Sequence, residues 1–186
     1  MIALDWRGFG ASDKPSEPAR YGRDMLADVA RLLDHLGIRQ VHLVGHSMGA
    51  TGAAGFAVRH PARVRTLVLA AGAFQDSAAL AQRFTRWTQD LEQGSGMEWA
   101  LKGNDRRALI ATLRNGPPSI SPAEAAPIRI PTLGIVGNRD GQAEDTRRLG
   151  DWWPGVRVVI VDGAGHGDIL ARPEFLQALR AHLGPQ

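Results

Sequence analysis

The sequence predicts an α/β fold, with a doubly wound, mostly parallel sheet of about five strands in a single domain. Strand-like and helix-like segments alternate along the chain, which is the pattern of parallel strands joined by crossover helices. The strand-like segments at residues 64–71, 131–137 and 156–161 are apolar and almost uninterrupted, as expected for strands covered on both faces. A length of 186 residues suits one well-buried domain.

The first half of the chain supplies two strands and two helices. Residues 1–5, MIALD, predict a short strand, and a loop rich in glycine and proline follows. Apolar residues then recur at helical spacing from Met25 to Leu36, and Gly37 is placed to end that helix. The next strand is predicted by VHLV at residues 41–44. A helix follows it at residues 48–60, and its small residues permit close approach to a sheet.

The interval from about 74 to 131 contains no clear strand. Helices are expected at about Ala78–Leu91 and Met97–Leu113, before a proline-rich stretch. Such an insertion either covers the strand ends, where open α/β sheets bind ligands, or is an ordinary pair of surface helices. Periodicity leaves both alternatives open. A final amphipathic helix is predicted from Pro173 to Leu183.

Composition excludes several classes of function. The net charge is only +3 and the arginines are scattered, which argues against nucleic acid as a partner. The chain has no cysteine, which excludes disulfides and thiolate catalysis, and no His or carboxylate spacing suggests a metal site. No apolar run approaches the ~18 residues of a membrane span, and no signal pattern opens the chain. We therefore expect a cytoplasmic protein with no membrane partner and no metal.

Ser47 stands in the sequence GHSMG, between a predicted strand and a predicted helix. Glycines at 45 and 49 allow a sharp turn there, which would hold the serine in a strained and exposed position above the sheet. At the helix N-terminus, the N–H of Met48 would be free to stabilise an oxyanion. The alternative is a turn with a structural role only.

A nucleophilic serine needs a base, and the base needs an acid to orient it. Asp140 and His166 each follow a predicted strand, so they are expected at the same edge of the sheet as Ser47. Taken alone, Asp140 fits a loop carboxylate or helix cap and His166 a structural histidine. The order Ser, Asp, His favours a catalytic triad. For His46, beside the serine, we expect packing on the opposite side of the strand rather than catalysis.

Four segments resemble successive landmarks of the α/β-hydrolase fold family, in its serine esterase and lipase-like branch. They are IALDWRGFGASDKP, LVGHSMGA, PTLGIVGNRDG and DGAGHGDILARPEFL. The resemblance covers nearly the whole chain and implies cofactor-free hydrolysis through an acyl-enzyme, with Ser47 as nucleophile, Asp140 as acid and His166 as base. Residues 74–131 match the family's variable cap. A serine at this position disfavours the aspartate-nucleophile branches, the epoxide hydrolases and haloalkane dehalogenases.

The chain departs from the family at its beginning, because its first segment resembles the family's fourth strand. The resemblance thus implies a truncated or minimal member, without three strands, a helix and the His-Gly loop that supplies a second oxyanion donor. We expect residues 1–5 to pair with residues 40–44, so that the N–H of Phe9 joins that of Met48 as donor. The alternative is a site with one donor. The unguarded first strand also predicts a homo-oligomer formed through its edge.

The expected activity is hydrolysis of small or medium carboxylic esters. Lactone hydrolysis, perhydrolysis and C–C bond hydrolysis use the same residues and stay open. Another alternative is a catalytically impaired remnant that serves as a binding or assembly module. A nucleotide-binding oxidoreductase fits poorly, because Gly45, Gly49 and Gly52 do not make the G-x-G-x-x-G spacing.

Overall fold

The computed structural model describes residues 1–72 and 78–184, which divide between two compact units. The first unit consists of Met1–Leu32 and Gln75–Pro118, and the second of Leu33–Phe74 and Ser119–Gln186. The predicted cap interval of about 74–131 is therefore shared between them, and its start near residue 74 lies outside the described residues. The single domain stays a prediction.

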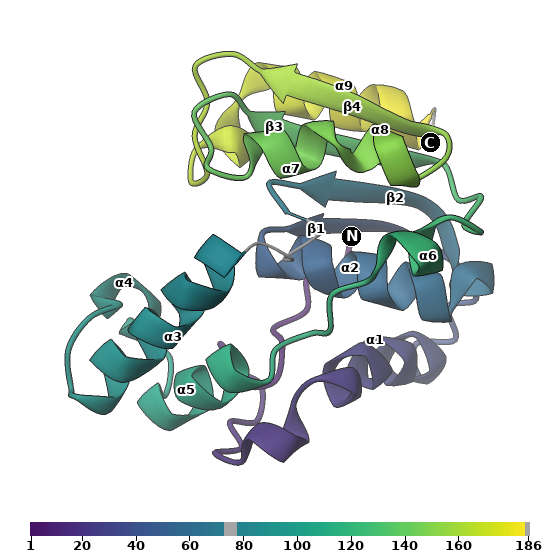
Figure 1. Cartoon of the computed structure of the whole chain (residues 1–186). Helices are drawn as coiled ribbons and strands as arrows, with labels where there is room; N and C mark the ends of the chain where they lie inside the picture. Colours follow the sequence, from purple (N-terminus) through teal and green to yellow (C-terminus); the bar gives the residue numbers. More distant parts are fainter. Residues whose placement is uncertain (73–77, 185–186) are drawn as a thin grey trace. The chain divides into compact units, whose positions relative to one another are not determined.

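The second unit contains a parallel sheet with the strand order β1-β2-β3-β4 (Figure 1). The strands are β1 (Val41–His46), β2 (Val64–Ala70), β3 (Thr132–Gly137) and β4 (Val156–Val161). β2 and β3 are the most buried, which agrees with their uninterrupted apolar sequences. The predicted α/β class and parallel sheet are confirmed, and the described residues form four strands where about five were expected.

Helices lie on both faces of this sheet, as a doubly wound fold requires. Gly134 of β3 faces α7 (Ala143–Arg147) and α8 (Leu149–Trp152), because a Cβ there would touch side chains of both helices. On the other face, Arg157 of β4 donates a hydrogen bond to a carbonyl of α9 (Pro173–Leu183). The layers are thus helix, sheet and helix.

The face of the sheet on which α9 lies is exposed at β1. Val44 of β1 pairs in register with Val68 of β2, so the two side chains share this face. Val68 is fully buried, whereas Val44 is 44% exposed. Among the described residues, β2 is the only strand paired with β1, which is therefore an edge strand.

The helices that precede and follow β1 in the sequence begin and end close to their predicted positions. α1 (Arg23–His35) stops two residues before Gly37, whose φ of 66° is the left-handed conformation that commonly follows a helix. α2 (Met48–Arg59) follows β1 after the single residue Ser47, and most of its small residues are buried. The second unit also contains three shorter described helices, namely η2 (Pro61–Arg63), α6 (Pro122–Ala125) and η3 (Ile169–Ala171).

The first unit is helical. It contains most of α1 together with η1 (Pro18–Arg20), α3 (Ala78–Glu92), α4 (Glu98–Leu101) and α5 (Arg106–Arg114). The single helix predicted at 97–113 is wrong, because α4 and α5 are separate. Gly103 between them has a φ of 83°, and the Asp105 carboxylate caps α5 by accepting the N–H of Ala108. No helix in the described part of the chain combines the length and apolar character of a membrane span.

Residues 1–5 form no strand, so their predicted pairing with residues 40–44 is wrong. A strand needs a neighbour that takes its backbone hydrogen bonds, and none of the described strands pairs with this segment. Its side chains are instead exposed, with Met1, Ile2 and Leu4 among the exposed large apolar residues.

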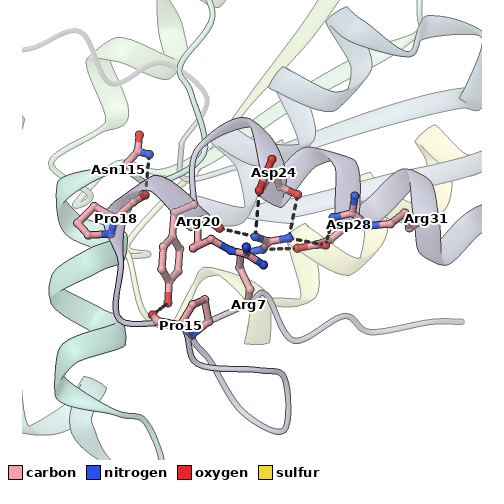
Figure 2. Close-up of polar contacts among 9 residues, drawn as sticks. Arg7, Pro15, Pro18, Arg20, Asp24, Asp28, Arg31 and Asn115 are labelled. Carbon is pink, nitrogen blue, oxygen red and sulfur yellow. Dashed lines mark hydrogen bonds and ion pairs between the residues drawn. The ribbon is translucent and has the colours of Figure 1, made fainter.

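An arginine cluster in the first unit fixes the loop that follows (Figure 2). The Arg7 guanidinium donates to both carboxylate oxygens of Asp28, at 2.6 and 2.8 Å, and to the carbonyl of Arg20. It also forms an ion pair of 3.4 Å with Asp24. Burial alone would raise the pKa of Asp28, but hydrogen bonds from Arg7 and Arg31 lower it below its usual value. The positive charge of Arg7 and the negative charge of Asp28 therefore stabilise each other.

Candidate active site

Ser47 occupies a strained turn between β1 and α2. Its φ of 55° and ψ of −121° lie in a region that residues other than glycine rarely adopt. Gly45 makes the turn possible, because a Cβ there would lie 2.2 Å from the carbonyl oxygen of Gly49. The Ser47 N–H donates to the carbonyl of Ala70, which ties the turn to β2. The turn has the strained form that the sequence predicts.

Of the three predicted triad residues, His166 lies within hydrogen-bonding distance of both others. His166 Nε2 is 2.9 Å from the Ser47 hydroxyl, and His166 Nδ1 is 2.9 Å from Asp140 Oδ2. A carboxylate only accepts, so Nδ1 carries the ring proton and Nε2 accepts from the serine hydroxyl. Asp140 follows β3 and His166 follows β4, and the carboxyl ends of parallel strands share one edge of the sheet.

Asp140 is shielded from solvent and its orientation is fixed. Its side chain is 2% exposed, whereas that of His166 is 42% exposed. The second carboxylate oxygen of Asp140 accepts the N–H of Gln142 at 2.9 Å. The acid is therefore held in place, while the base remains accessible from outside.

The loop that carries His166 packs against the loop that carries Asp140. A Cβ at Gly137 would lie 2.1 Å from the carbonyl oxygen of Ala164, so the two backbones touch. The Arg139 N–H donates to that same carbonyl at 2.9 Å. The Asn138 side chain accepts the N–H of Gly163 at 2.9 Å. Backbone contacts thus set the spacing of acid and base.

His46 contributes a contact that sequence reasoning missed. Its Nε2 lies 2.9 Å from the main-chain oxygen of His166, and the two ring centroids are 5.0 Å apart. The expectation of packing rather than catalysis stays a prediction, and the structure adds a hydrogen bond that the sequence did not indicate. His46 and His166 are 120 positions apart in the chain. The one sequence feature that could have indicated the contact is that His46 directly precedes Ser47.

The two predicted oxyanion donors differ in their hydrogen bonding. Met48 is the first residue of α2, so its N–H has no partner within the helix. The Phe9 N–H donates to the carbonyl of Trp6 at 2.9 Å, within the first unit. The Phe9 side chain packs beside Leu91 and Leu109. Both donors stay predictions, and Phe9 would have to open its present hydrogen bond to serve.

Other features of the described residues add no second reactive centre. No group of three or more His, Asp or Glu among them is placed to hold a metal ion. A cavity of about 470 Å³ in the first unit is lined in part by Arg7, Arg20 and Asp28. Arg7 and Asp28 are already paired, and the three triad residues do not line this cavity.

Comparison with known proteins gives matches to hydrolases. A family model described as the alpha/beta hydrolase fold matches residues 1–96. The chain is 50% identical over 70 residues to a 2-hydroxymuconate semialdehyde hydrolase from Pseudomonas sp. strain CF600, a match that covers 37% of this chain and 24% of that protein. It is 48% identical over 68 residues to epoxide hydrolase 2 of Siraitia grosvenorii, covering 36% and 22% respectively.

A solved structure matches over nearly the whole chain. The crystal structure of a hydrolase from Pseudomonas aeruginosa PA01 aligns with a TM-score of 0.79 and 26% identity, covering 97% of this chain and 78% of that one. The sequence matches to the two curated relatives, by contrast, span less than a quarter of each relative's length.

Proposed function

We propose that this chain, which belongs to the alpha/beta hydrolase fold family, is a serine hydrolase that cleaves small or medium carboxylic esters. The observation that carries the proposal is the continuous hydrogen-bonded series from Asp140 through His166 to Ser47, with both distances 2.9 Å. Such a series activates a serine hydroxyl that would otherwise be a weak nucleophile.

In the acylation half of the reaction, His166 Nε2 takes the hydroxyl proton as Ser47 Oγ bonds to the ester carbonyl carbon. The Asp140 carboxylate stabilises the imidazolium that forms. The N–H of Met48 donates to the oxyanion of the tetrahedral intermediate. The intermediate then expels the alcohol, which takes the proton from His166 and leaves an acyl-serine.

In the deacylation half, a water molecule gives a proton to His166 as its oxygen attacks the acyl carbon. The second tetrahedral intermediate collapses, the carboxylic acid leaves, and Ser47 recovers its proton from His166. The partial exposure of the His166 ring is compatible with the approach of this water.

A second candidate is hydrolysis of a semialdehyde, favoured by the 50% identity with the 2-hydroxymuconate semialdehyde hydrolase. It would use the same three residues. The relative named epoxide hydrolase carries less weight, because Ser47 stands where the resemblance expects an aspartate nucleophile in that branch.

The test measures hydrolysis of p-nitrophenyl acetate and butyrate by the purified chain, with 2-hydroxymuconate semialdehyde as a parallel substrate. Ser47→Ala should abolish turnover with an unchanged melting temperature. Ser16→Ala is the matched control, because Ser16 is an exposed serine whose hydroxyl donates to the neighbouring Glu17 carboxylate. It should behave like the wild type.

Turnover of the semialdehyde alone would favour the second candidate over the ester. A folded wild type that hydrolyses neither substrate would refute the proposal and favour a binding or assembly module. Equal activity of Ser47→Ala and wild type would exclude Ser47 as the nucleophile.

A further inference from the structure

His46 links the strand that carries the nucleophile to the residue that acts as base. It is the last residue of β1 and directly precedes Ser47. Its ring Nε2 lies 2.9 Å from the main-chain oxygen of His166. The contact therefore spans the two segments whose spacing sets the distance from Ser47 Oγ to His166 Nε2.

The chemistry of this contact fixes the tautomer of His46. A carbonyl oxygen can only accept, so Nε2 must carry the hydrogen. Burial lowers the pKa of His46, and the hydrogen bond to the carbonyl opposes this effect only in part. The charge of a protonated His166 would lower the pKa of His46 further, while Asp140 acts in the opposite direction. The neutral ring with a proton on Nε2 is the form that fits.

Neighbouring positions of the His166 loop are held by other groups. The Gly163 carbonyl accepts from the Arg172 guanidinium at 2.9 Å, and the Gly165 N–H donates to Asp168 Oδ1 at 2.6 Å. Among the described residues, the main chain of His166 has one hydrogen bond, which its carbonyl accepts from His46. Loss of the His46 donor would remove the hydrogen bond that holds the main chain at His166.

We propose that His46 is a positioning residue, whose Nε2–H holds the main chain of His166 and so sets the approach of the imidazole to Ser47. The inference rests on the proposed serine hydrolase function. A misplacement of about 1 Å in a reacting group can cost ~10² in rate. Removal of the donor should therefore lower kcat by about 10- to 100-fold and leave KM near the wild-type value, because His46 acts through His166.

The test compares two variants of similar size in the p-nitrophenyl ester assay. His46→Leu cannot donate a hydrogen bond, whereas the amide nitrogen of His46→Gln can take the place of Nε2. We expect the loss of kcat in His46→Leu and recovery to within a few-fold of wild type in His46→Gln. Equal kcat values for the two variants would overturn the inference. If His46→Leu does not fold, His46→Asn replaces it, because its shorter amide falls short of the carbonyl.

A second measurement does not depend on turnover. Nitrogen-15 NMR of the histidine rings in the wild type should show His46 neutral, with its proton on Nε2, at neutral pH. A proton on Nδ1 would overturn the inference even in an active enzyme. A wild type without ester turnover would refute the proposed function alone, and the tautomer of His46 would still decide the positioning role.

Discussion

Gly45→Ala should damage the fold and the site together, because no room exists for a methyl group at this position. A Cβ at Gly45 would lie 2.2 Å from the Gly49 oxygen, 2.4 Å from its carbonyl carbon and 2.6 Å from the Ala50 nitrogen. All three are backbone atoms of α2, so no side chain can rotate away. The substitution must push β1 and α2 apart.

The size of the effect follows from these distances. A comfortable carbon–oxygen contact is roughly 1 Å longer than the one imposed. Overpacking of this kind typically costs about 1–3 kcal/mol of folding free energy. For a chain of this length, each kcal/mol lowers the melting temperature by about 2–4 °C, so a fall of roughly 2–12 °C is expected. Displacement of Ser47 by about 1 Å should also lower kcat by ~10².

Thermal unfolding followed by circular dichroism, together with the ester assay, measures both effects. Gly49→Ala is the matched control from the same motif, because a Cβ there meets nothing within 4 Å and Gly49 is helical. It should keep or slightly raise the melting temperature, since alanine favours a helix over glycine by up to about 1 kcal/mol. Identical melting temperatures for Gly45→Ala and the wild type would refute the reasoning.

Three further predictions concern the acid, the pH dependence of stability and association. Asp140→Asn should lower kcat by ~10⁴ with little change in melting temperature, because the amide favours the wrong tautomer of His166; wild-type kcat would contradict this role. Burial lowers the pKa of His182 below its ordinary 6.5, so on acidification the unfolded chain binds a proton at this residue before the folded chain does. The neutral His182 therefore contributes to the free energy of unfolding above about pH 6.5, and this contribution is lost as the pH falls further. The melting temperature should thus fall more steeply from about pH 7 to about pH 5 in wild type than in His182→Gln, and parallel curves would exclude this contribution. We still expect self-association, with an interface formed by the exposed Met1, Ile2 and Leu4 or by the unpaired edge of β1. A monomer mass in light scattering at micromolar concentration would contradict it.

The sequence predicts the sheet well where burial dictates the pattern. β2 and β3 are covered on both faces, and their apolar runs mark them to within a residue or two. Residues 1–5 have the same apolar character, but composition does not supply the neighbouring strand that a strand requires. The break between α4 and α5 could have been found from Gly103 and the capping residue Asp105.

The candidate site could be predicted because the order of strands and helices alone places its residues together. Ser47, Asp140 and His166 each follow a parallel strand, so they share one edge of the sheet whatever the details of packing. The contact from His46 to the His166 carbonyl could not be predicted in the same way. It depends on the path of a loop 120 residues away, which no local pattern describes.

Reaction with a fluorophosphonate tests most directly whether His166 activates Ser47 as a nucleophile. Peptide mapping by mass spectrometry after treatment should find one phosphonyl group, on Ser47, with labelling absent in Ser47→Ala and strongly slowed in His166→Ala. A folded wild-type chain that leaves Ser47 unmodified, or that is labelled equally fast without His166, would contradict the account.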